Sequence, residues 1–443
     1  MADTNLAAEM DTVGINGDTS FLMLCSALVF LMSLPGLALF YGGLVQSKNV
    51  LSIFMQCFGI VCVCGLLWAA IGYSLSFSGM EPYIGDLNFA FLEPMRTNRH
   101  AMKDHVPLVV FFLFQGTFAV ITPALIIGSW AERAKFIPVL IFCALWEILV
   151  YCPVCHWIWG GGWLAQKGIR DFAGGLVVHA TAGGAAIVAA LMLPSRPGFP
   201  DKCAPPHNMP MVLTGASLLW VGWFGFNGGS ALHGGTTAAM AAAVTAASAM
   251  VGTLVWLVIE GYRSKPTVEA AVTGMVAGLG SITPASGFVG MPGAIGIGLI
   301  AGTVCYGMTA LIKERGLADD ALDVFSVHGV GGLIGTVLTA FFSSSALGGS
   351  GYDEGVGMMQ LLAVQCLGCL ATLVWSVCIS AALIKGLDLT IGFCHSRKEQ
   401  EIGLDSVVHG GRAYDTQLAE EARKVQFSSD ENESSTADDD SEA

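Results

Sequence analysis

The chain has 443 residues, of which 54% are hydrophobic and only 12% are charged, and its mean hydropathy is +0.65. Soluble domains carry about 25% charged residues, so this composition argues against an ordinary soluble domain and favours a membrane protein that faces lipid. The net charge of −14 argues against nucleic-acid binding, and much of it lies in the polar sequence SSDENESSTADDDSEA, which has too few apolar residues to fold.

Successive apolar segments predict an all-α polytopic membrane protein with about eleven transmembrane helices, since about 20 apolar residues suffice to cross a bilayer. The segments cover residues 21–41, 50–77, 106–130, 136–154, 173–193, 210–228, 236–262, 268–283, 292–312, 324–343 and 357–387. We therefore expect an extracellular N-terminal segment (1–19), a transmembrane domain (20–387) and a cytoplasmic tail (388–443) whose acidic last part is disordered.

The distribution of basic residues predicts that the N-terminus lies outside and the C-terminus inside. An odd number of helices places the two ends on opposite sides, and cytoplasmic loops are enriched in Lys and Arg. With the N-terminus outside, most basic residues fall in inner loops or after the last helix. The basic residues left outside are Arg96, Arg99, Lys103, Lys167 and Arg170.

Two histidines occupy matching places in the fifth and tenth predicted helices. VVHATAGG (177–184) and SVHGVGGLIG (326–335) each place a histidine before small residues. A repeat of five helices must be inverted in the membrane, so the sequence predicts an inverted five-helix repeat plus one extra C-terminal helix. Counted from Asp171 and Asp323, His179 and His328 would lie roughly 12 and 8 Å deep, from opposite faces. We therefore expect the two rings to meet near the midplane.

An ionisable residue inside the membrane is expensive, which makes a functional role the default interpretation. The alternative for each histidine is a ring satisfied by a neighbouring carbonyl. Two histidines at matching places in an inverted repeat favour a pore. Neutral imidazoles offer one donor and one acceptor each, and low dielectric disfavours protonation of both rings. Such a pair would admit a small polar molecule and resist a bare cation.

Short motifs for cofactor chemistry are weak in this chain. Cys152-Pro-Val-Cys155-His156 matches a haem-attachment pattern but lies at the end of an apolar helix, where isolated matches arise by chance. The sequence has no HExxH motif, no convincing metal-ligand spacing and no GxSxG elbow. We expect no cofactor, no metal and no enzymatic activity.

Six stretches, in order, resemble the ammonium transporter (Amt/Mep/Rh) family, and most closely its Amt branch. They are PGLALFYGGLVQSKN (35–49), FQGTFAVITPALIIGSWAERAKF (114–136), DFAGGLVVH (171–179), GWFGFNGGS (222–230), DVFSVHGVGG (323–332) and GLDSVVHGGRAY (403–414). The resemblance covers residues 18–414. It implies an ammonium transporter or ammonia channel that recruits ammonium outside, deprotonates it and passes ammonia, with or without the proton, through a twin-histidine pore.

The same resemblance implies a role for each matched residue. His179 and His328 would line the pore, and Asp171 would support the outer cation site. The short match WGGG (159–162) adds Trp159. Together with it, the remaining matched residues would form the outer site and gate: Phe114, Phe118, Phe226 and Ser230. From the residues alone, Trp159 could be an interfacial anchor, the phenylalanines ordinary packing, Ser230 a hydroxyl bonded to its own helix and Asp171 a helix cap.

The resemblance further implies a homotrimer in the plasma membrane and a cytoplasmic regulatory partner of the trimeric PII type. Glu147, in the middle of the fourth apolar segment, departs from the family pattern. It could be protonated, paired at a subunit contact or involved in proton handling. An ammonium sensor that signals through its cytoplasmic tail is the alternative function.

Overall fold

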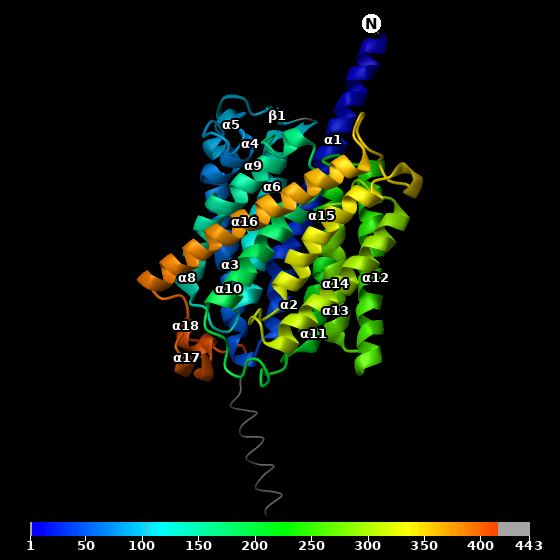
Figure 1. The fold of residues 1–443 in the computed structure, drawn as a ribbon. Helices are drawn as coiled ribbons and strands as arrows, with labels where there is room; N and C mark the ends of the chain where they lie inside the picture. The colour runs from blue at the N-terminus through cyan, green and yellow to red at the C-terminus, as the bar shows by residue number, and fades with distance from the viewer. Residues whose placement is uncertain (1, 104, 415–443) are drawn as a thin grey trace, which may run out of the picture.

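A computed structural model describes residues 2–103 and 105–414 as a bundle of long helices. In Figure 1 helix α1 (Ala2–Leu31) begins at one end of the bundle, and the short helices α17 (Arg397–Ile402) and α18 (Leu404–His409) lie at the other. The acidic end of the chain, predicted to be disordered, lies outside the described residues.

Ten helical stretches in the described residues are long and apolar enough to cross a membrane. They are Asn16–Leu44, Ser47–Phe77, Leu108–Trp130, Phe136–Ile158, Gly175–Met192, Met209–Gly228, Thr236–Arg263, Met291–Arg315, Phe325–Phe342 and Met358–Thr390. The shorter apolar helix Val268–Ile282 accounts for the eleventh predicted segment. Each predicted segment thus corresponds to a helix, and the chain is a multi-pass α-helical membrane protein.

Most of these stretches consist of several helical elements. The α-helices after α1 are α2 (Leu37–Leu44), α3 (Val50–Leu67), α4 (Tyr73–Phe77), α5 (Glu93–Thr97), α6 (Leu108–Leu125), α7 (Ile127–Trp130), α8 (Phe136–Trp146), α9 (Cys152–Ile158), α10 (Thr181–Met192), α11 (Met209–Trp223), α12 (Thr236–Arg263), α13 (Val268–Ile282), α14 (Met291–Arg315), α15 (Gly331–Phe342) and α16 (Met358–Thr390). Short 3-10 turns are η2 (Ser47–Asn49), η4 (Ala90–Leu92), η6 (Ala165–Lys167) and η10 (Ser345–Leu347). Strands β1 (Met102–Lys103) and β2 (Val106–Pro107) pair antiparallel, with Met102 opposite Pro107.

Six spans contain a π-helical segment, in which an extra residue per turn re-aims the side chains that follow. These segments are η1 (Met32–Gly36), η3 (Trp68–Gly72), η5 (Glu147–Tyr151), η7 (Gly175–Ala180), η8 (Phe224–Gly228) and η9 (Phe325–Val330). Such bulges are rare in helices and occur often at functional sites. His179 lies in η7, Phe226 in η8 and His328 in η9, so three of the predicted pore residues occupy these segments.

The two histidine-bearing spans pack tightly against each other because glycines line their crossing. A Cβ atom on Gly183 would lie 2.1 Å from the Cα of Gly329, and one on Gly332 would lie 2.5 Å from the carbonyl oxygen of Gly175. The π-helical segment η9 packs against α10, and η7 packs against α15. The backbones can therefore approach closely at the level of the histidines.

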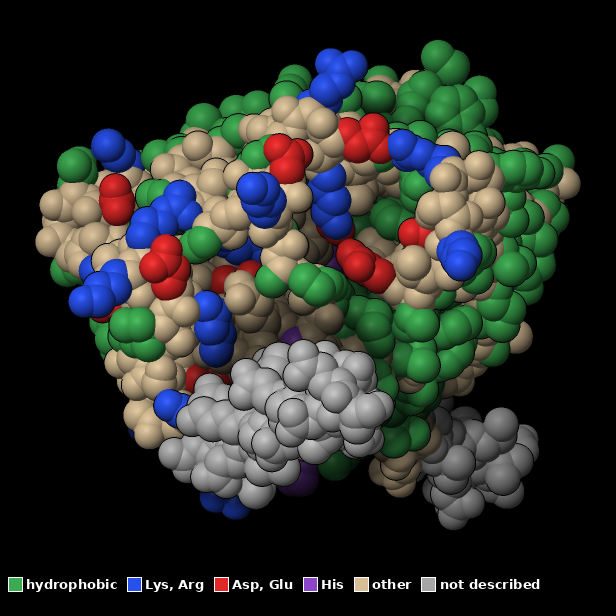
Figure 2. Space-filling view, turned by 90° about the horizontal axis from the view of Figure 1, so that it is seen from below, with side chains coloured by type: hydrophobic (Ala, Val, Ile, Leu, Met, Phe, Trp, Pro, Cys, Tyr) green, Lys and Arg blue, Asp and Glu red, His purple; other side chains and the backbone are tan. Residues whose placement is uncertain are grey.

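The first part of the tail packs on the end of the bundle that carries α17 and α18 (Figure 1). The carboxylate of Asp405 accepts hydrogen bonds from the backbone N–H groups of Leu51 and Ser52, at 3.0 and 2.8 Å, and so caps the start of α3. Lys48 donates to the carbonyl oxygen of Glu401 at 2.6 Å. Figure 2 looks at this end and shows charged side chains of both signs around a hollow.

Candidate functional site

His179 and His328 meet in the interior of the bundle. Their Nδ1 atoms are 3.2 Å apart, and their ring centroids are 5.1 Å apart. Both side chains are buried, with 1% and 5% of the residue exposed. Since one Nδ1 must donate to the other, two neutral rings carry opposite tautomers. One Nε2 is then an acceptor, and the other is a donor.

Asp171 fixes the start of the span that carries His179. Its two carboxylate oxygens accept four backbone N–H groups, those of Gly174, Gly175, Leu176 and Val177, at 2.6 to 3.1 Å. Gly174 has a φ of 112°, which a side chain would strain. These bonds satisfy N–H groups that a helix start leaves without partners. Burial raises the pKa of the Asp171 carboxyl above its usual value, and the four hydrogen bonds offset part of this effect.

Aromatic rings stack beside the histidines. Phe226 lies 6.1 Å from the ring of His179 and 4.3 Å from the ring of Phe118, measured between centroids. Phe118 in turn contacts Phe114 at 5.1 Å and Trp159 at 5.7 Å. Both Phe118 and Phe226 are 1% exposed. The rings of Phe226 and Phe118 thus lie between His179 and Trp159 in a continuous series of ring contacts.

Trp159 and Ser230 are only partly buried. The indole Nε1 of Trp159 donates to the carbonyl oxygen of Asp171 at 2.8 Å, which fixes the ring beside Phe118. The hydroxyl of Ser230 donates to the carbonyl oxygen of Phe226 at 2.9 Å. The Ser230 oxygen keeps lone pairs that can accept an N–H group from a cation, while the Trp159 face can attract positive charge. All eight predicted site residues therefore lie in one cluster of contacts or along the cap below it.

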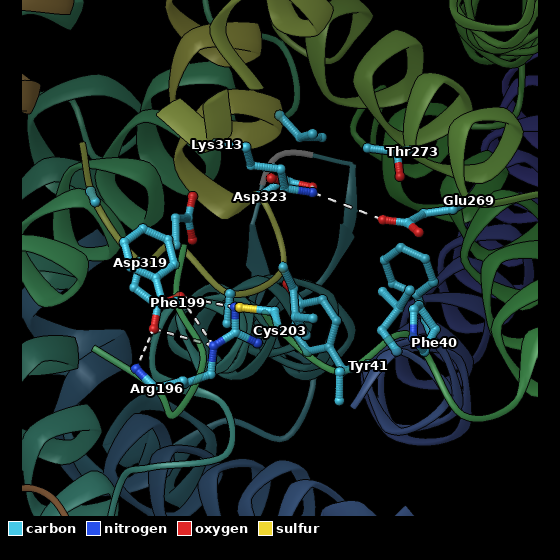
Figure 3. Close-up of a pocket in the computed structure, with 18 of the residues that line it drawn as sticks. Phe40, Tyr41, Arg196, Phe199, Cys203, Glu269, Thr273, Lys313, Asp319 and Asp323 are labelled. Carbon is cyan, nitrogen blue, oxygen red and sulfur yellow. Dashed lines mark hydrogen bonds and ion pairs between the residues drawn. The ribbon is translucent and has the colours of Figure 1, made fainter. Parts of the chain in front are cut away.

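Two cavities meet at His328. The smaller one, of about 10 Å³, contains both histidines, and its other lining residues are mainly apolar. A cavity of that size holds about one water-sized molecule. The larger one, of about 230 Å³, opens toward the charged end of the bundle and is drawn in Figure 3. Both cavities are lined by Phe40, Tyr41, Val276 and His328.

A buried ion-pair network, which the sequence did not predict, contributes Arg196 and Asp319 to the wall of the larger cavity. Arg133 pairs with Asp319 at 2.5 Å, and both side chains are fully buried. Arg196 pairs with Asp319 at 2.8 Å and with Glu132 at 3.2 Å. Paired guanidinium groups hold the pKa of the Asp319 carboxyl below its usual value, against the effect of burial. The network joins three loops that lie far apart in sequence, and no local pattern marks such a contact.

The span that carries His328 has its own acidic cap. Asp320, not Asp323, occupies the place equivalent to Asp171: its Oδ2 accepts the backbone N–H of Phe325 at 2.7 Å, at the start of η9. Asp323 instead pairs with Lys313 at 2.7 Å. His179 follows Asp171 by eight residues and His328 follows Asp320 by eight. This equal spacing was the signal in the sequence that could have identified the second cap.

Glu147 and the cysteine motif lie apart from the cavities. Glu147 is fully buried within the chain, close to Gly72, and lines neither cavity at the histidines. This position does not favour a subunit contact. His156 is buried, with its ring nitrogens 3.1 and 2.6 Å from the carbonyl oxygens of Ser76 and Glu81. Among the described residues, no group of three or more His, Cys, Asp and Glu side chains is arranged to hold a metal.

Comparisons with known proteins give one consistent result. The family model "Ammonium Transporter Family" matches residues 20–414. The chain is 41% identical to an ammonium transporter of Bacillus subtilis over 90% of this chain and 98% of that one. Among solved structures, "Sensor Amt Protein" matches with a TM-score of 0.83 and 29% identity, over 90% of this chain and 99% of that one. Mep2 of Saccharomyces cerevisiae matches with a TM-score of 0.79 and 34% identity, over 86% and 88% of the two chains. The chain belongs to the ammonium transporter family.

Proposed function

We propose that the chain recruits ammonium at an outer site, removes a proton and conducts ammonia past the histidine pair. The observation that carries this proposal is the buried contact of His179 and His328 in a cavity of about 10 Å³. A cation in that space would lose nearly all its water and gain no charged partner, which costs several kcal/mol. Ammonia needs only one donor and one acceptor, and the outward Nε2 atoms supply both.

The outer site would hold the cation before it loses its proton. Trp159 offers an aromatic face, Ser230 offers a lone pair, and Asp171 contributes negative charge through the cap rather than by contact. A cation over an aromatic face gains about 0.5–2 kcal/mol, and the gain rises as water is removed. Phe118 and Phe226 would then move aside to admit ammonia, and their close packing keeps water out between events.

The remaining expectations extend this proposal to the assembled protein. We propose an N-outside, C-inside orientation in the plasma membrane, a homotrimer with one pore per subunit and a PII-type partner at the tail. The long apolar side chains exposed on α12 and α14, such as Leu254 and Leu299, are available to lipid or to neighbouring subunits. The charged face in Figure 2 is available to a cytoplasmic partner.

Reconstituted vesicles test the pore. Under an ammonium gradient, the parent chain should give ammonia flux, and simultaneous current under voltage clamp would show whether charge accompanies it. His179→Ala and His328→Ala should each impair flux or selectivity about tenfold or more, because loss of one buried hydrogen-bond partner costs about 1–3 kcal/mol. His233→Ala is the matched control, since His233 is exposed and outside the pore. Parental flux and selectivity in both pore variants would contradict the assignment.

An ammonium sensor is the second candidate, favoured by the match to a solved "Sensor Amt Protein" and by the docking of α17 and α18 on the start of α3. A chain without residues 391–443 distinguishes the two. Uptake that survives this deletion while ammonium-dependent signalling in cells is lost favours the sensor. Loss of uptake together with signalling, in a chain that remains folded, favours a transporter whose tail supports the pore.

A further inference from the structure

The carboxyl group of Asp320 lies in the wall of the larger cavity, and the proposed function gives it no role. Asp320 is 5% exposed, and its Oδ2 accepts the N–H of Phe325. Its Oδ1 is buried and has no hydrogen-bond partner of good geometry among the described residues, although the backbone N–H of Val324, like that of Phe325, favours the carboxylate form. An unpaired, buried carboxylate oxygen is costly, so the group is best satisfied with a proton on Oδ1.

The two equivalent caps therefore differ in chemistry. Asp171 accepts four N–H groups through both oxygens and has no oxygen left to carry a proton. Asp320 accepts the N–H of Phe325 through Oδ2, and its Oδ1 lies buried without such a bond. An inverted repeat with identical eight-residue spacing makes this a matched comparison: one acid has both oxygens occupied by backbone donors, and the other has one oxygen on which a proton can be gained or lost.

The surroundings of Asp320 keep these two protonation states close in energy. The same cavity wall carries Asp323, Lys313, Glu269, Tyr41 and His328, and Figure 3 shows Lys313 with Asp323 and Glu269. Asp319, next in the chain, is engaged by Arg133 and Arg196. Lys313 lies 2.7 Å from Asp323 and 3.8 Å from Glu269, so most of its charge is already compensated. Burial, followed by the charge of Asp323, raises the pKa of Asp320 to about 7.

We propose that Asp320 exchanges a proton with the substrate at the inner mouth of the pore. This inference rests on the proposed conduction path. For outward movement, the Asp320 carboxylate takes a proton from ammonium, which leaves ammonia and a carboxylic acid; the acid then releases its proton to water in the cavity. For inward movement, the acid gives its proton to emerging ammonia and re-forms ammonium and the carboxylate.

The position of the group supports this role. Of the four residues that line both the narrow cavity and the wide one, His328 is the one with ring nitrogens that can donate or accept a hydrogen bond, and Phe325, which Asp320 caps, lies three residues before it in η9. A substrate that leaves the histidines therefore enters the cavity that Asp320 lines. The cavity is wide enough for several water molecules, so released protons can reach the bulk.

The sign of the pH dependence follows from the reaction. Outward flux needs the carboxylate, which is lost as the pH on the inner side falls through about 7. In vesicles, the outer pH is fixed and the pH on the inner side is varied. The outward ammonia flux, divided by the ammonium concentration on the inner side, should therefore show an inflection near an inner pH of about 7. Asp320→Asn keeps an oxygen for Phe325 but cannot ionise, so it should lose the inflection and lower the flux several-fold on the plateau above it.

Asp323→Asn is the matched control, because it removes a neighbouring charge from the same cavity. It should keep the inflection and shift it to lower pH, since the Asp323 charge helps to raise the pKa of Asp320. Asp320→Glu should restore a titration with an altered midpoint. A parental inflection in Asp320→Asn, or loss of the inflection in Asp323→Asn as well, would overturn the proposal.

Two further readouts keep the outcomes distinct. No flux from the folded parent would contradict the proposed function itself, whereas parental flux with an unchanged Asp320→Asn profile would contradict only this inference. If Asp320→Asn does not fold, infrared spectra of the parent and Asp323→Asn decide. In the parent, a carboxylic acid band that disappears as the pH rises through about 7 supports the role, and in Asp323→Asn the same band should disappear at a lower pH. If neither protein shows such a band, the proposal is overturned.

Discussion

At the scale of single residues, polar side chains in this molecule often have a structural partner and a free atom. Ser230 bonds to its own helix, as the plainest reading of its sequence suggests, yet keeps lone pairs for a cation. Asp171 caps η7 with both carboxylate oxygens, and Trp159 donates to the Asp171 carbonyl while its ring stays partly exposed. The sequence could not separate these uses, because a cap, a backbone-bonded hydroxyl and a ligand can be the same residue.

Asp171 gives a clear test at this scale. Asp171→Ala removes the acceptor of four buried N–H groups, and a single lost cap costs about 0.5–2 kcal/mol. We expect a lower midpoint of thermal unfolding and a large loss of flux, whereas Asp171→Glu should retain the fold and part of the flux. The measurements are unfolding followed by intrinsic fluorescence and flux in vesicles. Equal flux from Asp171→Ala and the parent would show that the cap does not matter for conduction.

At the scale of elements, apolar segment length predicted the helices well, because crossing a bilayer constrains length and composition together. The segment expected at 268–283 is observed at Val268–Ile282, and the one expected at 324–343 at Phe325–Phe342. The π-helical segments were not predictable in this way. One extra residue in a turn changes where His179 points but leaves the apolar composition of the span unchanged.

The glycine crossing between the two histidine-bearing spans offers an element-level prediction. Gly183→Ala would place a Cβ 2.1 Å from the Cα of Gly329, so the spans must separate and the histidine contact must lengthen. Overpacking typically costs about 1–3 kcal/mol, and we expect lower thermal stability with reduced ammonia selectivity. Gly307→Ala is the control, because a Cβ there meets nothing within 4 Å. If both variants behave alike, the close approach is not needed.

At the scale of the whole molecule, the sequence predicted an inverted repeat, and the structure brings its two histidines into contact. The sequence did not identify the cap at Asp320, because Asp320 and Asp323 are both acids near the same helix start and only tertiary contacts distinguish them. The Arg133–Asp319–Arg196 network was likewise beyond reach, since its members come from loops separated by more than a hundred residues at the widest.

Membrane orientation is the whole-molecule property to measure. Cys203 is an exposed free cysteine in the loop expected inside. Partial burial of its thiol raises the pKa of the thiol. An impermeant maleimide at mildly alkaline pH should therefore label it only after the inner face is opened. Gln166→Cys in a Cys203→Ser background should be labelled from outside in intact cells. The reverse pattern would invert the proposed topology and place Asp320 at the outer mouth.

The cavity of about 10 Å³ at the histidines also limits how many substrate molecules can occupy the narrow part of the protein at once. On the proposed conduction path, a cavity with room for one small molecule cannot hold two substrates whose mutual repulsion would speed release, as it does in multi-ion channels. Each substrate molecule must leave this cavity by thermal motion before the next one enters. Throughput should then saturate with increasing supply, at a ceiling set by the dwell time of a single occupant.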